Sequence, residues 1–183
     1  MLSALLISMG KGSMWAMAAL VVGITSISCD RDRKPIQLPP LAEGPFEPRL
    51  KEGWRVHSVS YEGTMPNPFD TTTTAQFNGE ARAVSGEFTF TDRNDSALVD
   101  YRIDFIADLL VGMVPVHYAK QGDGIWRYDS TVKTLWFYDF PDTLEFVVDY
   151  DADTLQLWHS TVLIDYPDMN IVLPTRMDIE LRK

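Results

Sequence analysis

The strongest constraint on the fold is a period of two in the positions of the apolar residues, repeated in successive short segments of residues 122–157. Residues 98–106 (LVDYRIDFI) also show it, because aromatic or aliphatic residues there alternate with charged ones. Successive side chains of a β-strand point to opposite faces, so this pattern is typical of a strand with one buried face. Residues 171–182 continue the alternation, which predicts an all-β domain.

The chain is predicted to form a series of short strands separated by turn residues. Strands are expected at 53–61, 87–91, 98–106, 124–128, 133–138, 143–150, 154–164 and 171–182, with weaker candidates at 75–77 and 80–84. Turns are expected at Asn78-Gly79, 92–96, 121–124, 129–130, 140–142, 151–153 and 166–170, where Gly, Pro, Asn, Asp and Ser gather.

Two segments do not fit the strand pattern. Residues 62–74 contain Pro66 and Pro68 and are predicted to form a loop. Residues 107–114 (ADLLVGMV) are apolar without a clear period, which allows a short helix, a lid or a bulged strand. Both segments could cover an open end of the domain.

Strands at spacings of about 8–12 residues, without gaps long enough for helices between them, favour an antiparallel meander. A meander of about eight or nine strands leaves two exposed edges unless the sheet closes. Closure into an up-and-down barrel is therefore the expected architecture, and a β-sandwich is the alternative.

The first 28 residues have the character of a signal peptide. Lys11 provides a positive charge, and residues 14–27 form an apolar stretch too short for an ordinary membrane span. The Ser-Ile-Ser that precedes Cys29 resembles a bacterial lipobox, which implies cleavage after residue 28 and acylation of Cys29, for example by palmitate. The alternative is an anchor that is never cut. The signal would work from Met1, Met9 or Met14.

Cys29 is the only cysteine of the chain, which excludes a disulfide within the domain. Residues 29–49 are predicted to form a flexible tether, because five of the eleven prolines lie there and proline cannot donate to a ladder. The folded domain is expected at residues 50–183. Its partner would be a membrane, held through acylated Cys29.

The composition excludes one class of partner. The formal net charge is −10 and the isoelectric point is about 4.6. An acidic protein repels phosphates, so we expect no nucleic acid partner. The same charge disfavours direct binding of the domain to anionic lipid headgroups, which leaves the acyl chains as the anchor.

Several short motifs resemble the lipocalin-like domains of small bacterial lipoproteins. These are Gly124-x-Trp126 at the start of a strand, Leu135-x-Phe137, Asp153-x-Leu155-x-Leu157 and the closing Arg182-Lys183. Gly53-Trp54 departs from the family's opening Gly-x-Trp. The resemblance implies a calycin-type barrel in the bacterial cell envelope, most commonly on the outer membrane. It implies no shared ligand and no catalytic residues.

Aromatic residues are the candidate binding residues. Eight fall on the face assigned to the interior and are candidate pocket residues for a small hydrophobic ligand: Trp54, Phe88, Phe90, Tyr101, Phe105, Trp126, Phe137 and Phe146. The alternative is a core packed by these same rings. Trp136, Tyr138 and Trp158 fall on the opposite face, which predicts either an exposed aromatic patch or strands covered on both faces.

Metal-ligand and catalytic patterns are weak. Asp149-x-Asp151-x-Asp153 begins like a calcium loop, but Thr154 and Ser160 occupy the positions that require glycine and glutamate. The three histidines, His57, His117 and His159, lie on separate predicted strands. No metal site, cofactor or catalytic residue is therefore predicted.

The function expected from the sequence is a membrane-anchored, non-enzymatic module that binds a small hydrophobic molecule. One alternative is a structural or interaction lipoprotein with a filled barrel and an exposed aromatic surface. Another is a hydrolase or isomerase with scattered catalytic residues, which no motif supports here.

Overall fold

The computed structural model describes residues 38–183 except 52, 68–69, 94–95, 110–113 and 167–170. The described residues form one short helix and nine strands. They are α1 Glu47–Leu50, β1 Trp54–Asn67, β2 Asp70–Glu80, β3 Arg82–Arg93, β4 Ser96–Leu109, β5 Val114–Asp129, β6 Thr134–Asp139, β7 Asp142–Asp151, β8 Leu155–Tyr166 and β9 Ile171–Arg182. The prediction of an all-β domain is confirmed.

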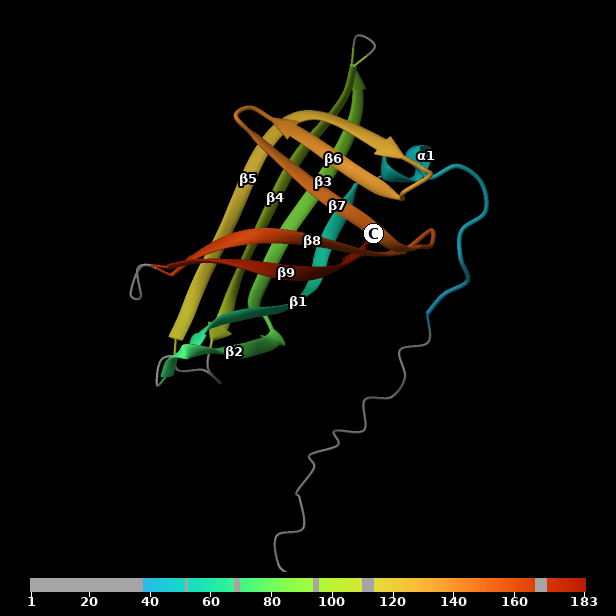
Figure 1. Cartoon of the computed structure of the whole chain (residues 1–183). Helices are drawn as coiled ribbons and strands as arrows, with labels where there is room; N and C mark the ends of the chain where they lie inside the picture. Colours follow the sequence, from blue (N-terminus) through green and yellow to red (C-terminus); the bar gives the residue numbers. More distant parts are fainter. Residues whose placement is uncertain (1–37, 52, 68–69, 94–95, 110–113, 167–170) are drawn as a thin grey trace, which may run out of the picture. The chain divides into compact units, whose positions relative to one another are not determined.

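The strands form one antiparallel sheet that closes on itself (Figure 1). From β3 to β9 each strand pairs with its neighbour in the chain. β1 pairs with β3 at its start and with β9 along the other edge, which closes an eight-stranded barrel. The additional strand β2 pairs with the second half of β1. Only Ala81 separates β2 from β3, and its amide donates to the carbonyl of Val59 at 2.8 Å. The predicted up-and-down barrel is confirmed, and it is consistent with a calycin-type architecture.

The apolar residues that alternate along the strands face the inside of the barrel, and most of the residues between them face the outside. In β8, Val162 and Ile164 are buried while Thr161 and Leu163 are exposed. In β9 the buried residues are Leu173, Thr175, Met177, Ile179 and Leu181. Because a strand offers every second side chain to the same face, both strands present one apolar face to the core.

Two of the predicted breaks between strands are wrong around β2. The expected loop at 62–74 belongs largely to β1 and β2, which pair from Ser60–Glu80 to Asn67–Asp70. The Asn78-Gly79 turn is also wrong, because Gly79 lies inside β2 opposite Tyr61. A Cβ on Gly79 would lie 2.5 Å from the Tyr61 hydroxyl oxygen, so this glycine leaves room for a ring.

The turn predicted at 121–124 is wrong for a similar reason, since β5 runs through it without a break. Gly122 lies opposite Tyr101. A Cβ there would lie 2.9 Å from the Tyr101 hydroxyl and would overlap the carboxylate of Asp139. The glycine therefore admits a polar contact between two other strands.

Other breaks are placed as expected. Turns follow β6 and β7 at the predicted positions, and β5 ends at Asp129. The pairs Arg93–Ser96 and Tyr166–Ile171 flank the turns predicted at 92–96 and 166–170, whose central residues lie outside the described residues. Of the ambiguous segment 107–114, residues 107–109 belong to β4 and Val114 begins β5, while 110–113 lie outside the described residues.

The segment from Pro39 to Leu50, assigned from the sequence to the tether apart from its last residue, contacts the barrel. The amide of Ala42 donates to the carbonyl of Asp151 at 3.0 Å, and Arg49 forms an ion pair with the Asp151 carboxylate. Phe46 packs on Tyr128 with ring centroids 4.4 Å apart. We call residues 39–50 the strap, because they hold the chain against one end of the barrel.

Candidate functional site

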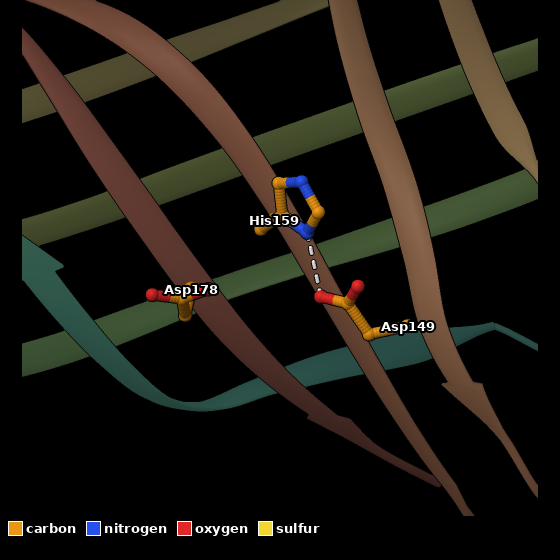
Figure 2. Close-up of side chains that lie close together, drawn as sticks. All are labelled: Asp149, His159 and Asp178. Carbon is orange, nitrogen blue, oxygen red and sulfur yellow. Dashed lines mark hydrogen bonds and ion pairs between the residues drawn. The ribbon is translucent and has the colours of Figure 1, made fainter.

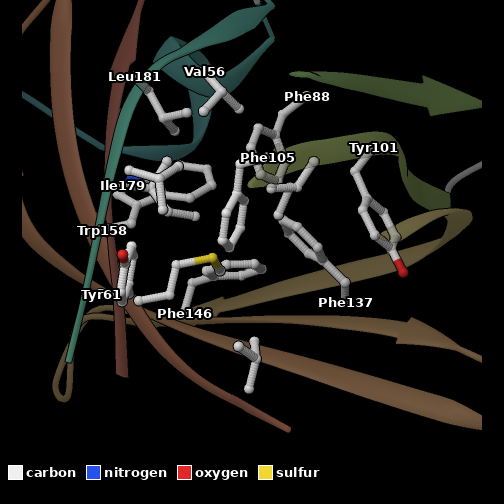
Figure 3. Packing of buried hydrophobic residues seen from close by; sticks show 14 of the residues in the cluster. Val56, Tyr61, Phe88, Tyr101, Phe105, Phe137, Phe146, Trp158, Ile179 and Leu181 are labelled. Atoms are coloured by element: carbon white, nitrogen blue, oxygen red, sulfur yellow. The ribbon is translucent and has the colours of Figure 1, made fainter. Parts of the chain in front are cut away.

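All eight aromatic residues predicted to line a pocket lie in the barrel core. They come from β1, β3, β4, β5, β6 and β7, and none exposes more than 7% of its surface. Figure 3 shows five of them by label, gathered between the strands: Phe88, Tyr101, Phe105, Phe137 and Phe146. The structure therefore brings these candidates together.

The rings contact one another directly. The Phe88 ring lies 5.9 Å from Phe137, 5.9 Å from Phe146 and 5.2 Å from Trp158, measured between centroids. Several pairs meet edge to face, an arrangement that aromatic quadrupoles favour. Centroid separations of this size leave no space for a further ring between the members, so the middle of the barrel is filled by the chain's own side chains.

The outer aromatic residues were predicted correctly only in part. Tyr138 is 45% exposed and Trp136 is half-buried, in agreement with an outer face. Trp158 is fully buried and its ring packs on Phe88 in the core, so its assignment to the outer face is wrong. Leu155 and Gln156 are adjacent and both buried, which shows that the two faces of β8 are not distinguished at its start.

Three buried polar atoms in the described part of the chain lack a hydrogen-bond partner: Nε1 of Trp126, Nε1 of Trp158 and Oε1 of Gln156. An unsatisfied buried donor or acceptor costs about 1–3 kcal/mol. Tyr101 is different, because its hydroxyl donates to Asp139 at 3.0 Å. Burial and that carboxylate raise the pKa of Tyr101. The core thus contains two indole donors without an acceptor and one amide oxygen without a donor.

A polar cluster on three neighbouring strands lies on the outside of the barrel (Figure 2). Asp149 of β7, His159 of β8 and Asp178 of β9 each offer one donor atom, and these atoms all lie within 4.8 Å of one another. Nδ1 of His159 hydrogen-bonds Oδ2 of Asp149 at 2.6 Å. This combination of one imidazole and two carboxylates is a possible metal-ligand set.

Strand register explains the cluster. His159 and Asp178 are direct cross-strand partners. A register shift between Val148 and Tyr150 makes Asp149 the extra residue of β7, where it meets His159. A β-bulge of this kind reorients a side chain relative to a regular strand.

Arg176 contacts Asp178 of this cluster and also lines a neighbouring groove. Its Nη2 and Nε contact Oδ1 of Asp178 at 2.9 and 3.1 Å, and its Nε lies 3.8 Å from Glu62. The hydrogen bond with Asp178 raises the pKa of Arg176. Arg176 and Glu62 also line an open groove of about 420 Å³ across β2, β1, β9 and β8, together with Gly63, Thr64, Gln76, Phe77, Asn78, Thr161 and Pro174.

The remaining sequence candidates do not converge. His57 is exposed, as interpreted from the sequence, and His117 pairs with Asp104 at 2.7 Å on another part of the surface. Asp151 is engaged by Arg49, so the aspartate triplet does not form a loop around one ion. Cys29 lies outside the described residues. Within the described part, no helix combines the length and hydropathy needed to span a bilayer.

Comparison of the chain with protein-family models, with curated proteins and with solved structures finds no match. The function therefore has to be argued from the residues themselves.

Proposed function

We propose that the chain is a lipid-anchored, lipocalin-like barrel of the bacterial cell envelope, on the outer membrane, that binds partners without catalysis through its outer surface. The supporting observation is the packing of Phe88 against Phe137, Phe146 and Trp158 at 5.2–5.9 Å. A barrel centre that its own rings occupy leaves the outside for recognition. The groove lined by Glu62 and Arg176 supplies a concave polar surface there.

The proposed anchor rests on the sequence before the domain, where an apolar stretch ends at the only cysteine. Acyl chains on Cys29 would hold the protein on a bilayer, because two or more chains give stable attachment. Nine residues separate Cys29 from the strap at Pro39. At about 3.3–3.6 Å per residue these nine residues span at most about 32 Å when fully extended.

A second candidate is the binding of a small hydrophobic molecule inside the barrel. The unpaired indole N–H groups of Trp126 and Trp158 favour it, because a ligand with acceptor oxygens would satisfy them. Such a ligand would have to enter among the rings that now touch one another. For that reason the outer surface is the first proposal.

Native mass spectrometry separates the two candidates. The protein is extracted from its own host in mild detergent and its mass is compared with the mass after denaturation. We expect no co-purified small molecule. A molecule found reproducibly and lost from a Trp158→Phe variant would overturn the first candidate in favour of the second. The Trp136→Phe variant is the control, since Trp136 lies outside the core.

Metabolic labelling with a palmitate analogue tests the anchor separately. Cys29→Ala should abolish labelling and either leave the precursor uncut or release the chain from membranes. Ser26→Leu, which brings the sequence closer to the common lipobox, should keep the label. Unchanged processing and membrane retention of Cys29→Ala would refute lipidation without affecting the conclusion about the barrel.

A further inference from the structure

We propose that Asp149, His159 and Asp178 bind a divalent transition-metal ion, with zinc as the preferred ion, on the outer face of β7, β8 and β9. The three donor atoms come from adjacent strands of one sheet and lie within 4.8 Å of one another. This site is independent of the barrel interior and of the anchor.

The donor atoms lie near enough for one ion to collect them after side-chain rotation. Zinc bonds nitrogen and carboxylate oxygen at about 2.0–2.2 Å, so two donors of a tetrahedral site lie about 3.3–3.6 Å apart. The three donor atoms lie within 4.8 Å of one another, so the carboxylates have to move inward by up to about 1.5 Å. The side chains of Asp149 and Asp178 are 44% and 40% exposed, so both carboxylates have the freedom to rotate by that amount.

The donor types favour a transition metal over calcium or magnesium. Calcium and magnesium take oxygen ligands, whereas imidazole suits zinc and its neighbours. Nδ1 of His159 and Oδ2 of Asp149 lie 2.6 Å apart, so they have to separate to about 3.4 Å for an ion to replace the hydrogen between them. With three protein ligands, a fourth position stays open towards solvent, as in zinc sites that bind a further molecule.

Arg176 is the competing cation. It contacts Asp178 only through Oδ1 in the contacts that the described residues make, which leaves Oδ2 with its lone pairs. Glu62 offers a second acceptor 3.8 Å from the Arg176 Nε. We therefore expect a bound ion to move the guanidinium from Asp178 towards Glu62, and thereby to change the charge of the adjoining groove.

The chain contains a matched control. His117 hydrogen-bonds Asp104 at 2.7 Å, and Arg102 contacts the same carboxylate at 3.2 Å. This arrangement repeats the His–Asp–Arg part of the proposed site, but among the described residues it lacks a second carboxylate within reach of one ion. It should therefore bind zinc much more weakly.

The test is titration calorimetry with zinc chloride on the full chain in detergent, in a Cys29→Ser background so that no thiol competes. We expect one zinc ion per chain. His159→Gln, Asp149→Asn and Asp178→Asn should each weaken binding by at least about tenfold, since even outer-shell partners of metal ligands are worth about that much. His117→Gln should change it by less than about twofold. Circular dichroism checks that each variant is folded.

Arg176→Gln should change the zinc affinity in the opposite direction. It therefore distinguishes the loss of a metal ligand from a general disruption of the fold. Removal of the competing positive charge should tighten zinc binding, and a variant that merely loosened the sheet would not. No measurable zinc binding, retention of full affinity by His159→Gln, or loss of affinity in His117→Gln alone would overturn the proposal.

Discussion

Tyr61 lies over Gly79, its direct cross-strand partner, with the phenol in the space that a β-carbon on Gly79 would occupy. Two residues along the same pair the arrangement is reversed, because the ring of Phe77 covers Gly63. The Tyr61 hydroxyl also donates to the Asp108 carbonyl at 2.8 Å and accepts from its amide at 2.7 Å. These bonds fix the ring of Tyr61, so a residue larger than glycine at position 79 would have to displace it.

Gly79→Ala should lower the free energy of unfolding by about 1–3 kcal/mol, the usual cost of an extra methyl group in a packed site. The neighbouring Asn78→Ala faces outward and should change it by less than about 0.5 kcal/mol. Urea unfolding monitored by tryptophan fluorescence measures both. Equal stability of the two variants would contradict the role assigned to Gly79.

Phe88→Ala should lower the free energy of unfolding by about 3–5 kcal/mol, because Phe88 is fully buried and contacts four other rings. Phe140→Ala is the matched control, since Phe140 is 97% exposed at the turn between β6 and β7. It should leave stability almost unchanged. A cost below about 1 kcal/mol for Phe88→Ala would indicate a pre-existing cavity in place of a filled core.

Arg49→Ala should detach the strap and lower the free energy of unfolding by about 1–3 kcal/mol. The ion pair of Arg49 with Asp151 is largely buried, with side-chain exposures of 12% and 18%, so its loss leaves a poorly solvated carboxylate. Lys51→Ala breaks the exposed pair with Asp92 and should cost well under 1 kcal/mol. Thermal unfolding compares the variants, and limited proteolysis should cut residues 39–50 faster in Arg49→Ala only.

Burial raises the pKa of Tyr118 to about 12. The folded protein therefore favours the neutral phenol, and this contribution to stability is fully present below pH 10, the ordinary pKa of tyrosine. It is lost as the pH rises through about 12. The free energy of unfolding should fall between these values, less steeply in Tyr118→Phe. Absorbance of tyrosinate near 295 nm follows the titration, and ionisation of all tyrosines near pH 10 in the folded protein would contradict the prediction.

The alternation of residues predicted the strands because each one has one apolar face, as β8 and β9 show. It did not predict which glycines end a strand. Gly79 and Gly122 look like turn residues in the sequence, and only the position of Tyr61 and Tyr101 across the pair explains them. A glycine that admits a ring and a glycine that turns the chain have the same local signature.

The local sequence pattern also fails to predict the cluster of Asp149, His159 and Asp178. In the sequence Asp149 belongs to a local aspartate triplet, whereas its partner His159 lies ten residues away and Asp178 lies on the next strand. Their proximity depends on the pairing of β8 with β9 and on the bulge in β7, neither of which a single sequence specifies. The aromatic candidates were found because burial of large rings follows directly from strand alternation.

The pairing of β1 with β9 has a consequence for the speed of folding. Val59 and Ile179 are partners across the closing seam, so the barrel is complete only after segments about 120 residues apart have met. Contacts between such distant segments carry a large loop entropy and place a domain among the slow β-folders, on a scale of milliseconds to seconds. Until β9 arrives, the first strand remains an open edge on which chaperones or other chains can act.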